Sequence, residues 1–175
     1  RQMLQNLYEF IKSPGRVKNL VFGLEKPMFE DNIEMLPNQL DKYQNKNIEN
    51  ALKAKDYYLI QGPPGTGKTS TVLVEIVKNL TFGQKDILIL AFTNRAVDEI
   101  ISKLVANNIN CIRIGRGDEN YHFENIIKNN KLNELYRIVK STKVIVSTVQ
   151  SFLVNLDLVS IKNFGTLIID EASQI

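Results

Sequence analysis

The fold of this 175-residue chain is decided by the stretch Gly62-Pro63-Pro64-Gly65-Thr66-Gly67-Lys68-Thr69. It matches the pattern G-x-x-x-x-G-K-[ST], whose glycines let the backbone turn tightly and direct several N–H groups at one point. Together with the amino end of the helix expected after it, these N–H groups form a cradle for phosphate oxygens. We therefore expect a P-loop here, between a strand and a helix.

The expected phosphate-binding residues are Gly62, Pro63, Pro64, Gly65, Thr66, Gly67, Lys68, Thr69 and Ser70. Lys68 is long enough to reach the β- and γ-phosphates of a nucleotide, so we assign it a catalytic role as well. The hydroxyl of Thr69 is a ligand that suits Mg²⁺. A glycine turn that merely joins a strand to a helix would not explain a lysine at this point.

An apolar strand with an acidic end completes the predicted site: Leu167-Ile168-Ile169-Asp170-Glu171. In a parallel sheet its carboxyl end lies at the same edge as the P-loop, where ligands bind. We expect Asp170 to hold Mg²⁺ together with Thr69. Glu171 is the predicted catalytic base that orients and deprotonates the attacking water. Without the P-loop, an Asp-Glu pair would be read as a solvated strand end.

Short apolar runs alternate with amphipathic segments from residue 57 onward, which predicts an α/β fold: a parallel sheet with helices on both faces. The expected strands are residues 57–61, 87–92, 111–114, 144–147 and 166–170, with helices between them. Residues 1–35 form a predicted N-terminal helical extension, the stalk or linker. Residues 115–130 are polar and predict a loop, in which the only histidine, His122, lies at the surface.

Composition sets further bounds. The length suits one α/β domain, and the net charge of +3 permits nucleic-acid binding without arguing for it. Cys111 is the only cysteine, so we expect a small buried hydrophobic side chain and an intracellular protein. No apolar run is long enough for a membrane span, so we expect no membrane partner. Because the chain begins at Arg1 and ends at Ile175, we expect an incomplete fragment.

Several segments resemble the motifs of superfamily 1 helicases. The P-loop is similar to their motif I, and Asp170-Glu171-Ala172-Ser173-Gln174 resembles the DEAxQ form of motif II. The segment Phe92-Thr93-Asn94-Arg95-Ala96-Val97-Asp98 looks like motif Ia, and Ser147-Thr148 looks like motif Ic. Leu40-Asp41-Lys42-Tyr43-Gln44 is similar to the Q motif. The combination resembles the 1B branch, with the nonsense-mediated-decay RNA helicase and the Okazaki-fragment nuclease-helicase.

The resemblance covers about residues 36–175 and implies a RecA-like ATP-binding domain, the first of two motor domains. It implies that Gln44 contacts adenine and gives a preference for ATP. It also implies that Thr93, Asn94 and Thr148 touch the backbone of a single strand, although a Thr-Asn pair after a strand is more simply a helix cap, with Asn94 as the capping residue. Arg113 could meet a phosphate, but we interpret it as a solvated strand end.

The implied function is that of an ATP-dependent helicase or translocase that moves 5′→3′ on single-stranded nucleic acid, with DNA favoured over RNA. Motif III and a second RecA-like domain with an arginine finger should follow residue 175. Phosphoryl transfer gains about 10³–10⁵ in rate from such a finger, so the chain alone should hydrolyse ATP very slowly. Two alternatives remain open: a P-loop ATPase or kinase that does not act on nucleic acid, and a nucleotide-gated nucleic-acid clamp.

Overall fold

The computed structural model describes residues 2–12, 15–63, 65–115, 132–156 and 161–174. The chain divides into two compact units, Arg1–Gln61 and Gly62–Ile175, and each is described by itself. The predicted loop over residues 115–130, apart from Gly115, and His122 within it lie outside the described residues. No helix among the described residues has the length and apolar character needed to cross a lipid bilayer.

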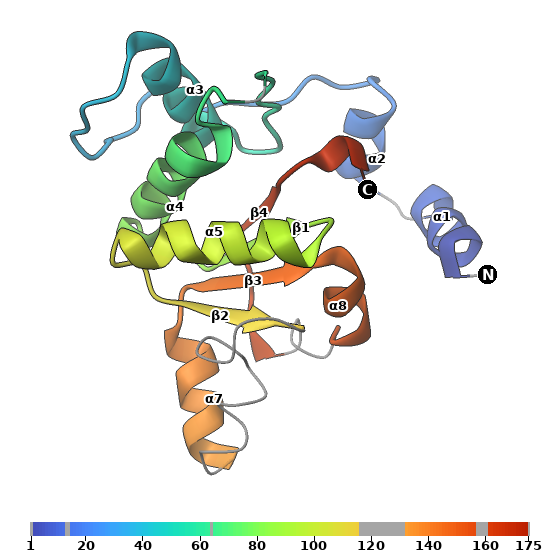
Figure 1. The fold of residues 1–175 in the computed structure, drawn as a ribbon. Helices are drawn as coiled ribbons and strands as arrows, with labels where there is room; N and C mark the ends of the chain where they lie inside the picture. Colours follow the sequence, from blue (N-terminus) through green and yellow to red (C-terminus); the bar gives the residue numbers. More distant parts are fainter. Residues whose placement is uncertain (1, 13–14, 64, 116–131, 157–160, 175) are drawn as a thin grey trace. The chain divides into compact units, whose positions relative to one another are not determined.

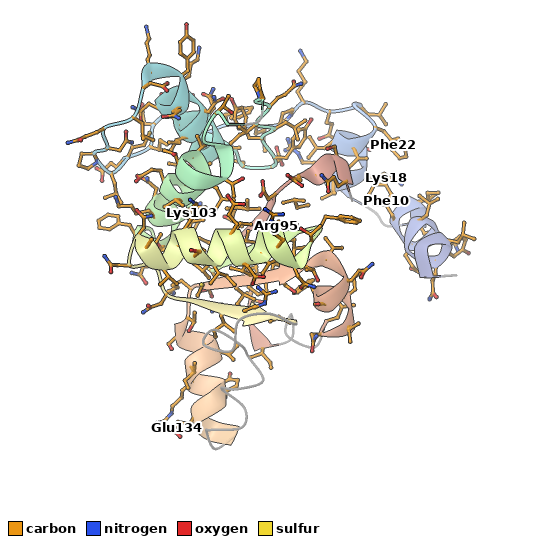
Figure 2. The ribbon with its side chains drawn as sticks, viewed as in Figure 1. Phe10, Lys18, Phe22, Arg95, Lys103 and Glu134 are labelled. Atoms are coloured by element: carbon orange, nitrogen blue, oxygen red, sulfur yellow. The ribbon has the colours of Figure 1, made fainter. Side chains whose placement is uncertain are left out.

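The first unit contains the helices α1 (Gln2–Lys12), α2 (Arg16–Val21) and α3 (Lys42–Lys53). Between α1 and the end of α2, the rings of Phe10 and Phe22 lie 6.2 Å apart, and the Lys18 ammonium donates to the Ile11 carbonyl at 3.1 Å (Figure 2). Helix α3 begins after Asp41, whose carboxylate accepts from the first free backbone N–H groups of the helix.

The strand predicted at residues 57–61 is wrong, because the structure assigns no strand to this segment. Side chains of the first unit hold it instead. The Tyr58 hydroxyl donates to Asn47 and accepts from Asn50, both on α3, at 3.2 Å each. The Tyr58 ring meets Phe29 edge to face at 6.3 Å. An apolar run of this length predicts a strand, but the partners of Tyr58 are side chains on α3 and Phe29 and not the backbone of a neighbouring strand.

The second unit is built on one parallel sheet in the order β2-β3-β1-β4 (Figure 1). The strands are β1 (Ile87–Ala91), β2 (Cys111–Ile114), β3 (Val144–Thr148) and β4 (Thr166–Ile169). Four of the five predicted strands are therefore confirmed. Strands β1 and β3 are buried along their whole length, as expected for apolar runs in a parallel sheet covered on both sides.

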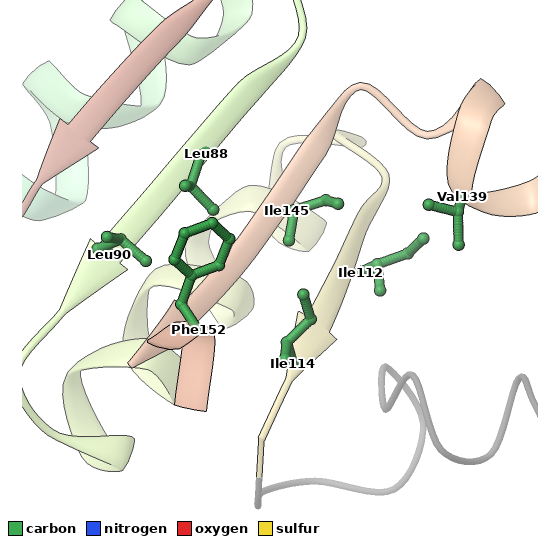
Figure 3. Close-up of a cluster of buried hydrophobic side chains, with 7 residues drawn as sticks. All are labelled: Leu88, Leu90, Ile112, Ile114, Val139, Ile145 and Phe152. Atoms are coloured by element: carbon green, nitrogen blue, oxygen red, sulfur yellow. The ribbon is translucent and has the colours of Figure 1, made fainter. Parts of the chain in front are cut away.

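The helices of this unit are α4 (Leu73–Phe82), α5 (Asn94–Ala106), α7 (Leu132–Ser141) and α8 (Val149–Val154), with a π turn η1 (Lys68–Val72) before α4 and a 3₁₀ turn η3 (Ala172–Gln174) after β4. One face of the sheet packs against α7 and α8 in a cluster of seven buried side chains (Figure 3). The members are Leu88, Leu90, Ile112, Ile114, Val139, Ile145 and Phe152.

The opposite face of the sheet lies against α5. Side chains alternate along a strand, so Arg113, between Ile112 and Ile114, points away from the α7 and α8 cluster. Its guanidinium pairs with Asp98, which lies on α5. The buried residues of α5 are Val97, Ile100, Ile101 and Leu104. Helices therefore cover both faces, which confirms the predicted α/β architecture.

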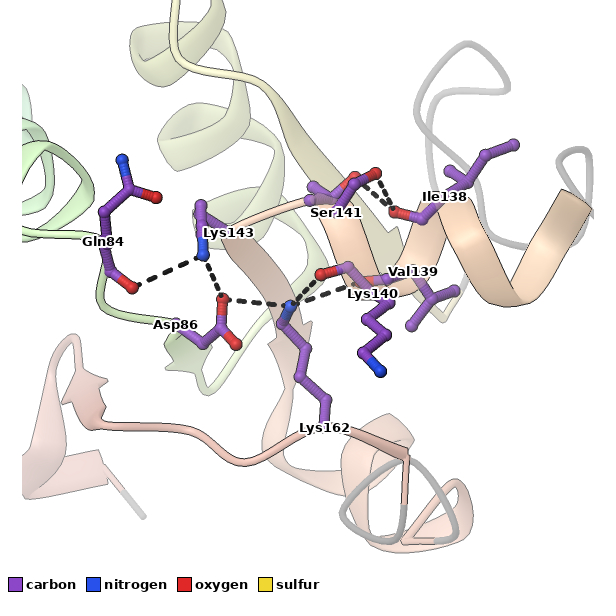
Figure 4. A network of polar contacts seen from close by, with 9 residues as sticks. Gln84, Asp86, Ile138, Val139, Lys140, Ser141, Lys143 and Lys162 are labelled. Atoms are coloured by element: carbon purple, nitrogen blue, oxygen red, sulfur yellow. Dashed lines mark hydrogen bonds and ion pairs between the residues drawn. The ribbon is translucent and has the colours of Figure 1, made fainter.

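A network of charges fastens the amino end of the sheet (Figure 4). The buried ammonium of Lys162 pairs with Asp86, just before β1, at 3.1 Å. It also donates to the carbonyls of Val139 and Lys140 at the end of α7, at 3.3 Å each. Lys143 pairs with the same Asp86 oxygen at 3.6 Å. This end of the sheet is structural, and the candidate functional residues gather at the carboxyl end.

Candidate nucleotide and nucleic-acid sites

The P-loop adopts the tight turn that its glycines permit. Gly65 and Gly67 have φ angles of 81° and 78°, in the left-handed region that side chains other than glycine rarely adopt. The Thr66 hydroxyl donates to the Pro63 carbonyl at 2.8 Å and closes the turn. Pro64 and the side chains of Lys68 and Ser70 lie outside the described residues, so their phosphate contacts stay predictions.

The helix after the P-loop begins with one wide turn. The N–H groups of Thr71 and Val72 both donate to the Gly67 carbonyl, at 2.9 and 3.0 Å, and the second of these bonds spans five residues. Such π turns are rare in helices and are frequent at functional sites. The turn continues directly into α4, so the positive end of a long helix follows the P-loop, as phosphate binding requires.

Thr69 and Asp170 lie in contact although they are 101 positions apart in sequence. The Thr69 hydroxyl is 3.2 Å and 3.4 Å from the two carboxylate oxygens of Asp170. The ladder between β1 and β4 delivers this carboxylate, because the Asp170 N–H donates to the Leu90 carbonyl at 2.9 Å. Both side chains are half-buried. The P-loop and the acidic end of β4 thus lie side by side in the second unit.

The chemistry of this pair fits Mg²⁺. Magnesium is usually held by one or two carboxylates, with substrate phosphates and waters completing an octahedron of oxygens. A threonine hydroxyl and one aspartate supply that kind of ligand set. Among the described residues no three histidine, cysteine, aspartate or glutamate side chains gather at one point.

Glu171 follows Asp170 in an unusual backbone conformation. Its φ angle is 53°, which costs energy for a residue with a Cβ, and its side chain is exposed. The Glu171 carbonyl accepts from the Gln174 N–H at 2.9 Å, which starts the η3 turn. Strained residues of this kind concentrate at functional sites. The strand thus turns sharply after Asp170, and the Glu171 side chain lies in solvent.

A cavity of about 430 Å³ opens at the carboxyl ends of β1, β2 and β3. It brings together all three residues predicted to contact nucleic acid, Thr93, Asn94 and Thr148. Sequence reasoning missed four residues that complete its lining, namely Phe92, Gly115, Gln150 and Ser151. Phe92 directly precedes Thr93 and Gln150 lies two residues after Thr148, so their closeness to the ends of β1 and β3 was the available signal.

The two threonines of this cavity cap helices. Thr93 caps α5, since its hydroxyl accepts from the Ala96 N–H at 3.1 Å. The expectation that Asn94 is the cap is therefore wrong, and Asn94 is the first residue of the helix. Thr148 caps α8 in the same way, accepting from the Ser151 N–H at 3.1 Å and donating to the Ser151 hydroxyl at 2.9 Å.

Gly115 is needed where it lies because the chain just after β2 passes very close to Ser151 on α8. A Cβ at this position would come within 2.7 Å of the Cβ of Ser151, a separation that real structures essentially never show. The φ angle of Gly115 is 98°, which also disfavours any other residue. The glycine after β2 therefore shapes this wall of the cavity.

The interpretation of Arg113 as a solvated strand end is wrong. Its side chain is 1% exposed and forms an ion pair with Asp98 on α5. Its second terminal nitrogen donates to the Asn94 Oδ1 at 3.2 Å. A charged residue at a strand end is usually solvated, but here α5 carries two acceptors to it. Only the packing of α5 on the sheet could show this.

Gln44 and Cys111 are the remaining described residues to which the sequence assigned a role. Gln44 lies on α3 in the first unit, where its N–H donates to the Asp41 carboxylate at 2.8 Å, so its contact with adenine stays a prediction. Cys111 is half-buried at the start of β2, and burial raises the pKa of its thiol to about 11. The thiol is therefore protonated at neutral pH and a poor nucleophile.

Comparison with known proteins places these features in a family. Residues 39–137 match the family described as AAA domain. The chain is 35% identical over 183 residues to the DNA replication ATP-dependent helicase/nuclease JHS1 of Arabidopsis thaliana, covering 95% of this chain and 13% of that protein. It is 33% identical over 172 residues to the helicase/nuclease DNA2 of Saccharomyces cerevisiae, covering 91% of this chain and 11% of that protein.

The chain thus spans about an eighth or less of the length of these relatives. Among solved structures, the Hef helicase domain of Pyrococcus furiosus aligns at 19% identity with a TM-score of 0.37, over 58% of this chain and 25% of that one. The family match, in contrast, covers more than half of the chain and includes the P-loop and α5. The chain therefore belongs to the AAA-domain family, as a motor domain in the branch of superfamily 1 helicases that includes the DNA2 helicase/nucleases.

Proposed function

We propose that this chain is the first motor domain of an ATP-driven helicase or translocase that moves 5′→3′ along single-stranded nucleic acid. The observation that carries the proposal is the contact between the Thr69 hydroxyl and the Asp170 carboxylate. It joins the P-loop to the acidic end of β4 at one point, as a single magnesium-bound triphosphate requires. The direction of movement rests on the motif resemblance alone.

The nucleotide site assigns one task to each of its residues. The P-loop N–H groups and Lys68 would bind the phosphates, and Gln44 would contact adenine. Thr69 and Asp170 would hold Mg²⁺, which when bound neutralises the negative charge that phosphoryl transfer concentrates on the phosphate oxygens. Glu171 would orient the attacking water and accept its proton. Its exposed carboxylate next to Asp170 supports that role.

The cavity at the ends of β1, β2 and β3 supports binding of a single strand. Thr93, Asn94 and Thr148 would touch the sugar-phosphate backbone there, a contact that involves no reading of bases. DNA is favoured over RNA because the two relatives described above are DNA replication proteins by name. A second RecA-like domain would supply the arginine finger and the other half of the groove.

Three further expectations belong to the same proposal. The motor domain would occupy residues 36–175, and residues 1–35 would form a stalk or linker before it. An intracellular location belongs to the proposal as well, and its one support is that a single cysteine cannot form a disulfide within the chain. Without a second domain the chain should bind nucleotide weakly and turn it over very slowly.

Nucleotide binding is tested with a fluorescent ATP analogue titrated into the 175-residue chain in the presence of Mg²⁺. Lys68→Ala should weaken binding at least about tenfold, because it removes a cation that pairs with phosphate. Lys78→Ala is the matched control, since Lys78 lies on α4 and pairs only weakly with Glu75 at 3.4 Å. Equal affinity of the Lys68 variant and the wild type would refute the nucleotide site.

Nucleic-acid binding is tested by filter binding of labelled oligothymidylate and oligouridylate, with and without a nonhydrolysable ATP analogue. We expect binding of both strands, tighter binding of DNA, and a change in affinity with nucleotide. A chain that binds nucleotide but neither strand would be a P-loop ATPase or kinase of another kind. Equal or tighter binding of the RNA would overturn the preference for DNA and leave the motor assignment in place.

A further inference from the structure

Arg113 is buried next to Asn94, which lines the cavity, and it reaches two residues of α5 at once. One terminal nitrogen pairs with the Asp98 carboxylate, and the other donates to the Asn94 Oδ1 at 3.2 Å. Asn94 and Asp98 are four residues apart, so they lie one above the other on the same side of the helix. The planar fork of a guanidinium can bridge two such acceptors, which a lysine ammonium does less well.

This contact fixes which way the Asn94 amide points. A guanidinium has five donors and no acceptor, so the Asn94 atom that faces Arg113 must be the oxygen. The amide NH₂ group lies in the same amide plane and points in a different direction from the oxygen. The side chain of Asn94 is exposed and lines the 430 Å³ cavity. The amide consequently presents hydrogen-bond donors on the side away from Arg113.

The hydroxyls of Thr93 and Ser151, which also line the cavity, can donate hydrogen bonds into it as well. The Thr93 oxygen accepts from the Ala96 N–H, and the Ser151 oxygen accepts from the Thr148 hydroxyl. Each of these contacts uses a lone pair and leaves the hydroxyl proton of Thr93 or Ser151 able to turn toward the cavity. Phosphate oxygens only accept hydrogen bonds, whereas the edges of bases both donate and accept. Donors gathered in this way suit a phosphodiester better than a base.

We propose that Arg113 is a positioning residue for nucleic-acid binding: by holding the Asn94 oxygen, it turns the Asn94 amide NH₂ toward a phosphodiester of the bound strand. The inference rests on the proposed function, since it concerns how the same cavity recognises its strand. Arg113 itself is 1% exposed and acts through Asn94, without touching the strand. The ligand class is therefore the phosphodiester backbone, recognised independently of base sequence.

A double-mutant cycle on the 175-residue chain tests this role, with the affinity for a labelled oligothymidylate of about 15 nucleotides as the readout. Asn94→Ala and Arg113→Met should each weaken binding about tenfold, the size of one hydrogen bond to a charged group. The double variant should bind no more weakly than either single variant, because both changes remove the same contact. Asp98→Asn is the matched control, since it removes the charge of the ion pair and leaves the Asn94 contact in place.

The salt dependence of binding separates a positioning role from a direct one. A residue that neutralises a phosphate contributes about 0.7 to the slope of log K against log salt for single strands, and its loss flattens that slope. Because Arg113 is buried, Arg113→Met should lower the affinity and leave the slope unchanged. A flatter slope would show that Arg113 meets a phosphate itself, and would overturn the proposal.

A further variant keeps the test decisive if Arg113→Met does not fold. Asn94→Asp keeps an oxygen facing Arg113 but replaces the NH₂ group with a second oxygen, so it should fold and bind more weakly than Asn94→Ala. If Asn94→Asp, or a folded Arg113→Met, binds the oligonucleotide as tightly as the wild-type chain does, the positioning role is overturned. The proposed function is upheld in that case, because the wild-type chain still binds the strand. If the wild-type chain binds nucleotide but not the oligonucleotide, both fall together.

Discussion

Replacing Gly115 with alanine should lower the free energy of unfolding of the second unit by about 2 to 5 kcal/mol. Two terms contribute to this value. A residue with a Cβ at a φ angle of 98° costs about 1–2 kcal/mol, because its Cβ crowds the following carbonyl. The new methyl group would lie 2.7 Å from the Ser151 Cβ, and overpacking of this kind costs about 1–3 kcal/mol.

The assay is urea unfolding followed by circular dichroism, and the design separates the two terms. Gly83→Ala is the matched control, because a Cβ there makes ordinary contacts of 3.5 and 3.7 Å at a φ angle of −71°, so stability should barely change. Placing Gly115→Ala in a Ser151→Gly background should remove the overlap and leave only the backbone cost. An unchanged loss in that background would refute the reasoning that residue 115 packs directly against Ser151 on α8.

Three other predictions follow from the site, the thiol and the charge network. Asp170→Asn should weaken nucleotide binding about tenfold in Mg²⁺ but not in its absence, as measured with a fluorescent ATP analogue, because it removes the charge that attracts the metal. Burial raises the pKa of Cys111 from 9.0 to about 11, so between these two pH values the thiol ionises in the unfolded chain and stays protonated in the folded one. The free energy of unfolding should therefore fall as the pH rises from about 9 to 11. The urea midpoints of Cys111→Ala, measured over the same pH range, should lack that fall. Asp86→Ala should cost about 3–5 kcal/mol by urea unfolding, because it leaves the buried ammonium of Lys162 without its carboxylate, whereas Lys143→Ala should cost less than about 1 kcal/mol.

Local patterns in the sequence were enough to predict the P-loop and most of the sheet. Glycines at positions 65 and 67 favour the positive φ angles that the turn adopts, and this preference belongs to the residue itself. Apolar runs of strand length predict buried parallel strands, and four of them form the sheet. The acidic end of β4 was expected beside the P-loop, and the contact between Thr69 and Asp170 shows it there, although the structure assigns no strand to residues 57–61 before the loop.

The segment 57–61 shows where local patterns stop. Its apolar residues predict a strand as well as those of β1 do, yet the Tyr58 hydroxyl and ring find partners on α3 and at Phe29. Strand formation needs a neighbouring strand to complete its hydrogen bonds, and an apolar run alone does not say whether that neighbour is available. The competing contacts are 8 or more residues away in sequence.

The sequence alone determined the phosphate-binding loop and the strand that leads to the acidic pair, because these follow from the conformational preferences of single residues and short runs. Tertiary structure alone decided that Arg113 is buried beneath Asn94 and Asp98, and that Gly115 closes against Ser151. Those contacts depend on how α5 and α8 lie against the sheet. Side-chain burial and polarity at such crossings are set by partners distant in sequence, which no local pattern encodes.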